Sequence, residues 1–552
     1  MSLSTPSNDP TTTSAQDPSG IALPPDSPPA AQAPTLERIA SRPSTSTTVA
    51  PQTEKKDEPQ EETPIDSEKV ADEKNDDNVI VVGWDSPDDP ANPRNWPLKR
   101  KWAVALTVSS FTFVSPISSS MVAPAAAQIA KGFNIHHSFE ANLTISIFVL
   151  AYAFGPLILG PLSEMYGRSR VLLGANLFFF AWNLGCGFAQ SEAQLMVFRF
   201  LAGFGGSAPL ACGGAVLSDM WVPEERGRAI AIYSLAPLLG PAIGPVAGGW
   251  IAEKSTWRWV FWATSIVAGI SETLGFFILQ ETFAPLLLKR KANRIRKQMD
   301  PEKGPVKEVR TIFEKPGQTR TFKQFLFVSL CRPFLLFARE PIIQLISMYL
   351  AFIYGVIYLV ITTIPPVFTD IYHETTGILG LHYIALGLGL FIASQVNARL
   401  LDKVYVMLKK RNNGQGEPEF RLVTVMPATL VIPAGLLISG WGAQEHVHWI
   451  VPDIGYALIG AGMVVTFQGM QTYVIDAFTV YAASALAAVS FFRSAAGFGF
   501  PLFAPAMFSA LGYGKGGTIL AACSAGIGCP AVYVFWRYGK KIRGMSSIAR
   551  KQ

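Results

Sequence analysis

Ionisable residues lie inside some of the long apolar stretches of this sequence, where a charge is costly unless it has a polar partner. Arg199 lies within residues 194–218 and Glu272 within residues 257–280. If residues 194–218 form a helix of a bundle, the Arg199 side chain should face its interior and find polar partners there. Glu272 is the acid placed deepest in such a stretch, and a buried acid can bind and release protons under physiological conditions. Glu272 is therefore a candidate proton carrier.

Other readings of the charged residues stay open. Arg199 lies about a turn from the start of its stretch, so its guanidinium could instead extend along the helix toward water. Glu140 and Asp370 are expected at one set of helix ends, and Asp219 and Asp476 at the other. Acids at helix ends ordinarily cap helices or pair with loops, which makes these four weaker candidates for proton transfer.

A short turn between two apolar stretches carries charges at a spacing that permits pairing. It reads Gly160-Pro-Leu-Ser-Glu164-Met-Tyr-Gly167-Arg168. Gly167 permits a tight turn with positive φ. Glu164 can pair with Arg168, or either residue with the start of a neighbouring helix. Such pairs can hold one conformation of a helix bundle and release it in another, although an ordinary charged turn would look similar.

Small residues and prolines recur in the stretch 228–252. The motif consists of Gly240, Pro241, Gly244, Pro245, Gly248 and Gly249. The glycines at intervals of four residues share one helix face, and the prolines remove backbone hydrogen bonds and allow a kink. We expect this flat face to pack against an opposite half of the molecule that moves relative to it. Glycines also follow Arg199, with Gly203 first, and would let a neighbouring helix approach closely.

Several kinds of chemistry find no support in the sequence. It has no GxxxxGK[ST] loop for ATP and no GxSxG nucleophile. The five cysteines show neither CxxC nor Cys/His metal spacing, and the histidine pairs near residues 136 and 446 are far from a zinc pattern. We therefore expect neither an enzyme nor a protein with a metal or cofactor.

Composition explains what must position these residues. The chain has 552 residues, of which 49% are hydrophobic and only 16% are charged, whereas soluble domains carry about 25% charged residues. Its apolar blocks are long enough to cross a bilayer. Residues 1–80 carry 6 Lys/Arg against 15 Asp/Glu and few aromatics. They lack the apolar surface to fold, and with the bridge that follows we assign residues 1–90 to a disordered tail.

Hydropathy predicts twelve spans in two sets of six. They lie near 103–128, 141–163, 170–189, 194–218, 228–252 and 257–280, and near 342–368, 376–400, 421–442, 449–472, 484–510 and 516–537. The expected units are a half at 91–280, a central loop at 281–341, a half at 342–537 and a tail at 538–552. With the N-terminus inside, the inner segments from Arg94 onward carry 34 Lys/Arg and the outer ones four. The positive-inside rule therefore predicts cytoplasmic termini.

The motifs together resemble the major facilitator superfamily. Residues 160–172 resemble its cytoplasmic loop signature, with Glu164 where the family usually has Asp. The segment from Arg199 resembles its fourth-span motif, whose arginine is implicated in proton coupling. Residues 240–249 resemble the motif of its proton-driven exporters. Local segments at 92–96, 257–262, 281–285 and 473–505 are similar to fungal twelve-span drug:proton antiporters.

The resemblance implies a fold class and a set of candidate residues. The fold would be all-α, with twelve transmembrane helices in two six-helix halves around a central cavity. Plausible cavity residues are Ser115, Tyr233, Tyr354, Tyr358, Gln468, Gln471 and Phe491. Aromatic and amide side chains of this kind suit an amphiphilic or mildly cationic ligand, although plain helix packing would use the same residues.

The expected function is proton-coupled export of small organic compounds, such as drugs, toxins or secondary metabolites. The expected location is the plasma membrane. We expect the protein to act as a monomer, with small molecules and protons as its partners and no nucleic acid. An importer or facilitator of a nutrient or polyamine is the first alternative, and the motif at 240–249 argues against it. A membrane receptor or sensor is the alternative from another class, disfavoured by twelve spans in two halves.

Overall fold

The structure, a computed structural model, describes residues 79–222, 225–299, 308–313, 322–478 and 481–545. All of these belong to one compact unit, Asn75–Gln552. Residues 1–78, which make up most of the predicted disordered tail, lie outside the described residues. The described part is almost entirely helical, as expected for apolar segments whose backbone groups must be satisfied inside a bilayer.

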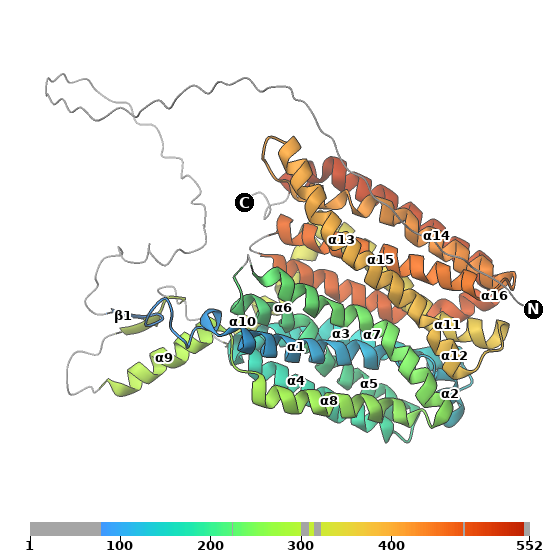
Figure 1. The fold of residues 1–552 in the computed structure, drawn as a ribbon, viewed down its shortest axis with the longest axis horizontal. Helices are drawn as coiled ribbons and strands as arrows, with labels where there is room; N and C mark the ends of the chain where they lie inside the picture. The colour runs from blue at the N-terminus through green and yellow to red at the C-terminus, as the bar shows by residue number, and fades with distance from the viewer. Residues whose placement is uncertain (1–78, 223–224, 300–307, 314–321, 479–480, 546–552) are drawn as a thin grey trace, which may run out of the picture. The chain divides into compact units, whose positions relative to one another are not determined.

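The first half consists of six predicted spans, and each corresponds to helix (Figure 1). Its helices are α1 (Leu98–Ser120), α2 (Ala126–Phe133), α3 (Ser138–Tyr166), α4 (Arg168–Gly187), α5 (Glu192–Gly206), α6 (Ala208–Met220), α7 (Arg226–Lys254) and α8 (Arg258–Ile278). The fourth span is divided into α5 and α6 at Ser207, two residues before Pro209, because proline cannot donate the next backbone hydrogen bond.

The first predicted span ends earlier than expected. Helix α1 stops at Ser120, and the chain makes a turn before α2 begins at Ala126. Pro124 lies in this turn, and proline disfavours helical backbone in the residue before it. The predicted range 103–128 thus combined two helices that hydropathy alone cannot separate.

The second half repeats the arrangement. It consists of α11 (Pro341–Pro366), η4 (Val367–Ile371), α12 (Thr376–Leu381), α13 (Tyr383–Arg411), η5 (Pro418–Leu422), α14 (Val425–Gln444), α15 (Ile450–Ala477) and α16 (Ala482–Met545). Helix α16 holds the last two predicted spans, which are separated by a kink at Gly512, where φ is 77°. The helix runs past residue 537 to Met545, so it includes the start of the predicted C-terminal tail.

Ten helical segments among the described residues are long and apolar enough to cross a membrane. The count differs from twelve for two reasons. The segment Ala482–Gly544 is one of the ten although Gly512 divides it. Helix α4 is not among them, because Arg168, Arg170 and two asparagines lower its hydropathy. All twelve predicted spans therefore have a helical counterpart, and the all-α prediction is confirmed.

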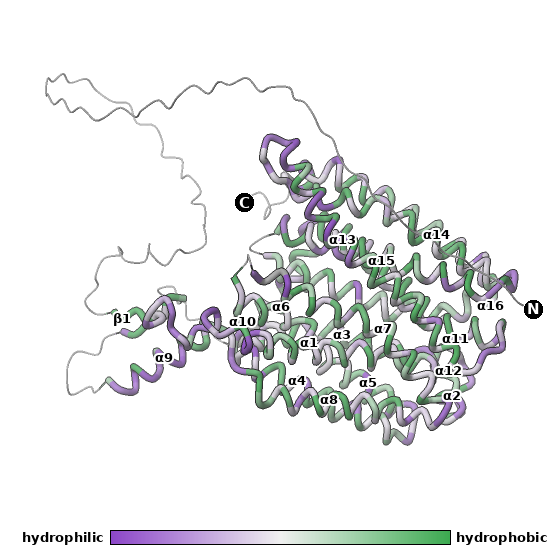
Figure 2. Tube along the Cα trace, in the orientation of Figure 1, coloured by the Kyte–Doolittle hydropathy of each residue, from purple (hydrophilic) through white to green (hydrophobic). Residues whose placement is uncertain are grey.

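A small polar module precedes and follows the first half. Strand β1 (Val79–Val82) pairs in parallel with β2 (Glu308–Thr311), with Val79 opposite Glu308. Helix η2 (Pro93–Asn95) and the basic helix α9 (Ala284–Gln298) belong to this region, and α10 (Phe322–Arg339) leads into α11. In Figure 2, α9 is hydrophilic along most of its length, in contrast to the apolar bundle. Strand β1 lies within the segment that composition assigned to the tail.

The two halves contact each other mainly through three pairs of elements. Helix α7 packs on α12 and α13, and α3 packs on α16. Polar contacts mark one end of the α7–α12 and α3–α16 contacts, and we call it the outer end because the sequence predicts that it faces away from the cytoplasm. Glu253 Oε2 accepts a hydrogen bond from the Gly377 backbone N–H at 2.6 Å, and Asn142 Nδ2 donates to the Pro501 carbonyl at 3.0 Å. The outer ends of the halves are therefore held together in this structure.

Candidate functional site

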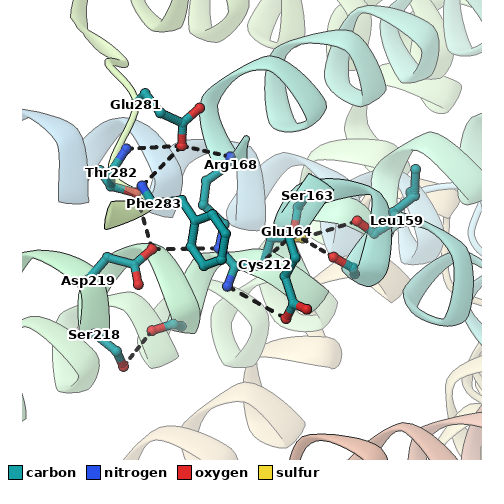
Figure 3. A network of polar contacts seen from close by, with 12 residues as sticks. Leu159, Ser163, Glu164, Arg168, Cys212, Ser218, Asp219, Glu281, Thr282 and Phe283 are labelled. Atoms are coloured by element: carbon teal, nitrogen blue, oxygen red, sulfur yellow. Dashed lines mark hydrogen bonds and ion pairs between the residues drawn. The ribbon is translucent and has the colours of Figure 1, made fainter. Parts of the chain in front are cut away.

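A charged cluster gathers at the inner end of the first half around Arg168 (Figure 3). Arg168 is the first residue of α4 and is buried. Its Nη1 donates to Ser163 Oγ at 2.6 Å, its Nε lies 3.5 Å from Asp219 Oδ2, and its Nη2 lies 3.8 Å from Glu164 Oε1. The pairing of Glu164 with Arg168 occurs as the sequence suggested, but Asp219 is the nearer acid.

Glu281 completes this cluster from the segment that follows α8. Its Oε1 accepts hydrogen bonds from the backbone N–H groups of Arg168, Thr282 and Phe283 at 2.9–3.1 Å. The Phe283 ring covers the guanidinium, with its centroid 4.9 Å from Arg168 Cζ. The start of α4 is therefore tied to the chain leaving α8, through a contact that spans 113 residues.

Gly167 is required at this turn for two reasons. Its φ is 105°, in the region that L side chains rarely adopt. A Cβ at this position would also collide with the Glu281 carboxylate, and it would lie 2.8 Å from Leu286 Cδ2. The predicted positive φ is confirmed, and the close approach of Glu281 adds a second constraint. At Gly160, in contrast, an added Cβ would meet no atom within 4 Å.

The second half has a counterpart of this cluster, centred on Arg421. Arg421, in η5, binds Asp402 Oδ1 at 2.9 Å and Asp476 Oδ2 at 3.0 Å. Its guanidinium carbon lies 4.2 Å from the Tyr405 ring centroid. Arg168 and Arg421 thus occupy matching places: each lies at the start of its half's third span and binds acids at the ends of the second and fourth spans.

Arg199 is fully buried and does not extend to the surface. Its guanidinium donates to four backbone carbonyls: Ser118 at 2.9 Å, Ile145 at 3.1 Å, Thr144 at 3.2 Å and Ser119 at 3.4 Å. Ser118 and Ser119 lie in the last turn of α1, whose carbonyls lack partners within the helix. The predicted interior location is confirmed, and the partners are helix carbonyls rather than an acid in the described part of the chain.

The glycine face of α7 does not contact the opposite half as expected. Added Cβ atoms at Gly240 and Gly244 would collide with α1, at Pro116 and Ser120, and one at Gly248 with Met121, the residue that follows α1. This face therefore packs within its own half, and the prediction was wrong about its neighbour. Periodicity identifies which residues share a helix face, but it does not say which helix lies against that face.

The adjacent face of α7 contacts the second half instead. A Cβ at Gly249 would meet the Thr376 carbonyl and lie 3.3 Å from Gly380 Cα. In return, a Cβ at Gly380 would lie 2.8 Å from the Pro245 carbonyl. Helix α7 is thus fitted closely on two sides, against α1 through one glycine face and against α12 through Gly249. A larger side chain on either face would separate the helices.

Glu272 lies on α8 at the boundary with α4. Asn176 Nδ2 donates to Glu272 Oε2 at 2.7 Å, and the carboxylate is half-buried. Its neighbours Ile270, Leu274 and Phe277 are exposed on the outside of the bundle. In Figure 1, α8 and α4 lie at the edge of the first half that is far from α13 and α14.

Three of the predicted cavity residues, Ser115, Tyr354 and Tyr358, lie between the halves. Tyr354 and Tyr358 of α11 have ring centroids 5.1 Å apart, and Tyr358 interacts with Tyr152 of α3 and Ser119 of α1. Ser115 joins this group, because its Oγ lies 2.6 Å from Tyr152 Oη. Hydroxyl groups from both halves thus converge near the carbonyls that bind Arg199.

The other predicted cavity residues have different surroundings. Tyr233 donates to the Pro209 carbonyl at 2.8 Å inside the first half. Gln468 is bonded to α13, through Ser394 at 2.7 Å and Asn397 at 2.9 Å. Phe491 packs against Phe154 of α3 and Phe334 of α10. Gln471 is part-buried on α15. The structure therefore does not gather the predicted set in one place.

Arg493 on α16 was missed by the sequence reasoning. Its guanidinium carbon lies 4.7 Å from the Tyr354 ring centroid and 4.9 Å from that of Phe467. Its Nη2 donates to Ser490 at 3.2 Å, and it forms no ion pair within the described ranges. The signal was present, because an arginine in the predicted span 484–510 is the same feature that singled out Arg199.

Comparisons with known proteins agree with this architecture. The profile of the Major Facilitator Superfamily matches residues 108–501. The efflux pump vrtL of Penicillium aethiopicum is 44% identical over 88% of this chain and 95% of its own length. The efflux pump radE of Floropilus chiversii is 40% identical over 84% of this chain and 85% of its own length.

Solved structures show the same fold at low sequence identity. A D-xylose–proton symporter superposes with a TM-score of 0.58 over 82% of this chain and 99% of its own, at 15% identity. At that level the likeness concerns the arrangement of helices and not the transported compound.

Proposed function

Because the chain belongs to the major facilitator superfamily, and is thus a multi-pass membrane transporter and not an enzyme, we propose that it exports small organic compounds in exchange for protons. The proposed substrates are amphiphilic compounds such as drugs, toxins or secondary metabolites. The proposed location is the plasma membrane, with both termini in the cytoplasm and a single chain as the working unit.

The proposed direction of transport rests on the packing of helix α7. This helix, whose motif resembles that of proton-driven exporters, is fitted against α1 on one side and against α12 of the other half on the other. The relatives named as efflux pumps, which match over most of both chains, support the same direction. The positive charge of the inner segments supports the proposed orientation.

Proton coupling is proposed to involve Arg199, with Glu272 as a candidate carrier. Arg199 binds carbonyls of α1 and α3, and Tyr358 of the second half is buried close to Ser119 of α1. A change in the contacts of Arg199 would therefore alter the packing of both halves. The hydroxyl cluster of Ser115, Tyr152, Tyr354 and Tyr358 is the proposed place where a substrate is held.

A cell-based efflux assay tests the proposal. Cells that make the protein, and matched cells that make Gly249→Val, are loaded with a panel of neutral, cationic and anionic fluorescent amphiphiles. We expect lower dye retention with the natural protein, lost when an uncoupler collapses the proton gradient while ATP stays high. Dependence on ATP alone would contradict the proposal.

The importer alternative predicts the opposite result. Cells with the protein would then accumulate a dye or nutrient faster than cells without it, and the uncoupler would lower that accumulation. The sugar–proton symporter shares the fold, so the fold by itself does not decide between these directions.

A further inference from the structure

Three ionisable side chains meet at the outer end of the second half, at a place the sequence reasoning did not identify. His382, between α12 and α13, has Nε2 2.6 Å from Glu374 Oε2 and Nδ1 2.8 Å from Asp453 Oδ2. All three side chains are largely buried, and the imidazole is stacked on the Phe368 ring at 3.5 Å between centroids. We call these three residues the histidine cluster.

The hydrogen bonds of the histidine cluster fix how many protons it holds. Each contact between a ring nitrogen and a carboxylate oxygen requires one proton between the two atoms. A neutral imidazole has a single N–H, so two contacts need either an imidazolium or a protonated carboxyl group. The cluster as seen therefore holds two protons and carries a net charge of −1. Loss of one proton leaves a charge of −2 and only one of the two hydrogen bonds.

The groups around the cluster offer it no other counter-charge. Within the described ranges, Glu374 and Asp453 form ion pairs only with His382. The aromatic side chains that face the cluster are neutral and come from the second half: Tyr372, Tyr383, Tyr456 and Trp449. The titratable groups on its rim are His448, Asp370 beside Tyr513, and Glu253 of α7. One Asp453 oxygen, Oδ1, is buried without a hydrogen-bond partner.

The cluster lies directly behind the contact between the halves. Glu374 begins the short segment that becomes α12, and Gly377 of α12 donates its backbone N–H to Glu253 of α7. His382 ends α12 and begins α13. The two hydrogen bonds of His382 thus hold both ends of the helix against which Gly249 and Pro245 of α7 are packed.

We propose that the histidine cluster is a proton-binding site that controls the outer contact between α7 and α12. With two protons the cluster keeps α12 in place and the outer end closed, as in this structure. When one proton leaves to the outside solution, Glu374 and Asp453 repel each other across a neutral imidazole, α12 is released and the outer end opens. A proton taken up from the outside restores the second hydrogen bond and closes it again.

This inference rests on the proposed exchange of substrate for protons and adds to it where an outside proton binds. Binding of a proton from the outside would close the outer end after substrate has left, which is the order that an exporter needs. The three residues are positioning residues for the gate and are not assigned contact with the substrate.

Distances between spin labels test the proposal without any substrate. One label is placed at Ser255→Cys, an exposed position after α7, and the other at Glu445→Cys, an exposed position after α14. The labelled protein is held in lipid nanodiscs. The cysteines outside the buried pair are first removed by the substitutions Cys331→Ser, Cys523→Ser and Cys529→Ser. Lys131→Cys with Ser255→Cys gives a control distance within the first half. Double electron–electron resonance is measured between about pH 5.5 and about pH 8.5, a range that spans the ordinary pKa of histidine.

We expect the distance between halves to lengthen as pH rises, while the control distance stays constant. Asp453→Asn should keep the short distance at both pH values, because an amide can accept the hydrogen bond without adding charge. Glu374→Gln, which is less buried, should do the same. His382→Gln should abolish the response to pH, whereas His136→Gln, at an exposed outer histidine of the first half, should leave it intact.

Several outcomes would overturn the proposal. The first is a distance between the halves that does not change with pH in the natural protein. The second is a change of that distance with pH that survives in His382→Gln and Asp453→Asn. The third is a loss of folding in every cluster variant, measured by gel filtration. Because the measurement involves no transport, it can fail while the efflux assay succeeds. A pH response without any efflux would instead count against the proposed function.

Discussion

The two halves place an arginine at the same point but support it differently. Arg168 of the first half is covered by Phe283 and reaches Asp219 at 3.5 Å and Glu164 at 3.8 Å. Arg421 of the second half makes closer pairs, at 2.9 and 3.0 Å, but the Asp402 side chain is 77% exposed. The shorter distances therefore occur where water screens the charges more strongly.

The difference lies in what each arginine is connected to. Glu281 binds three backbone N–H groups beside Arg168 and so joins α4 to the segment after α8. Arg421 joins only the ends of three helices of its own half. A buried charge that loses its partner is costly, whereas an exposed pair contributes little. We infer that the first-half cluster limits movement of the inner end and that the second-half cluster mainly orders a loop.

Arg168→Ala should have the largest effect. It removes the cation between Asp219, Glu164 and Ser163, and breaking a buried pair of this kind costs about 3–5 kcal/mol. We expect a clear fall in the unfolding temperature of the purified protein and loss of most efflux. Arg421→Ala is the matched variant. Equal losses in the two variants would break the comparison.

Gly167→Ala should have the next largest effect. The new Cβ would strain a backbone with φ of 105° and displace the Glu281 carboxylate, at a cost of about 1–3 kcal/mol. Gly160→Ala, seven residues earlier in the same motif, meets no atom and lies inside a helix. That control should be neutral or stabilising, by up to about 1 kcal/mol. Similar unfolding temperatures for both variants would show that Glu281 does not constrain the turn.

Arg421→Ala should cost less than Arg168→Ala, about 1 kcal/mol, because its partners Asp402 and Asp476 are 77% and 32% exposed and water screens these pairs. The loss should shrink further when the salt concentration is raised, because the Debye length falls to about 3 Å at 1 M. Thermal unfolding at low and high salt measures this dependence. A large loss that salt does not change would place Arg421 in the same class as Arg168.

Glu272→Gln should have the smallest effect on stability, because a glutamine oxygen can still accept the hydrogen bond from Asn176. As the proposed proton carrier, Glu272 should matter more for the pH dependence of efflux than for substrate affinity. Efflux rates across a pH series, with Thr273→Ser as a neighbouring control, test this. An unchanged pH profile would remove Glu272 from the coupling mechanism.

Patterns local in sequence were predictable, and contacts between distant residues were not. Apolar blocks predicted a helix for each of the twelve spans, and the cost of burying a charge predicted that Arg199 lies inside. Arg493 carries the same signal and could have been found. Positive φ at Gly167 followed from the motif, but Glu281 approaches it from 114 positions away, and no spacing rule links the two.

The histidine cluster is a second site whose contacts could not be predicted from the sequence. His382 binds Glu374 at a separation of eight residues and Asp453 at 71. Each of the three looks like an ordinary polar residue near a helix end. The prediction for the glycine face of α7 was wrong for a related reason. The spacing of the glycines located the face, but only the packed structure identified α1 as its neighbour.

Efflux from proteoliposomes under an imposed pH gradient tests whether substrate leaves in exchange for protons. The purified protein is reconstituted, a dye identified in the efflux assay is enclosed, and an outward or inward pH gradient is imposed with valinomycin and potassium to hold the membrane potential at zero. We expect dye to leave faster when the outside is acidic, because protons and dye then move in opposite directions. Gly249→Val should lose this response. Dye movement in the same direction as the protons, or movement indifferent to the gradient, would contradict the proposed exchange.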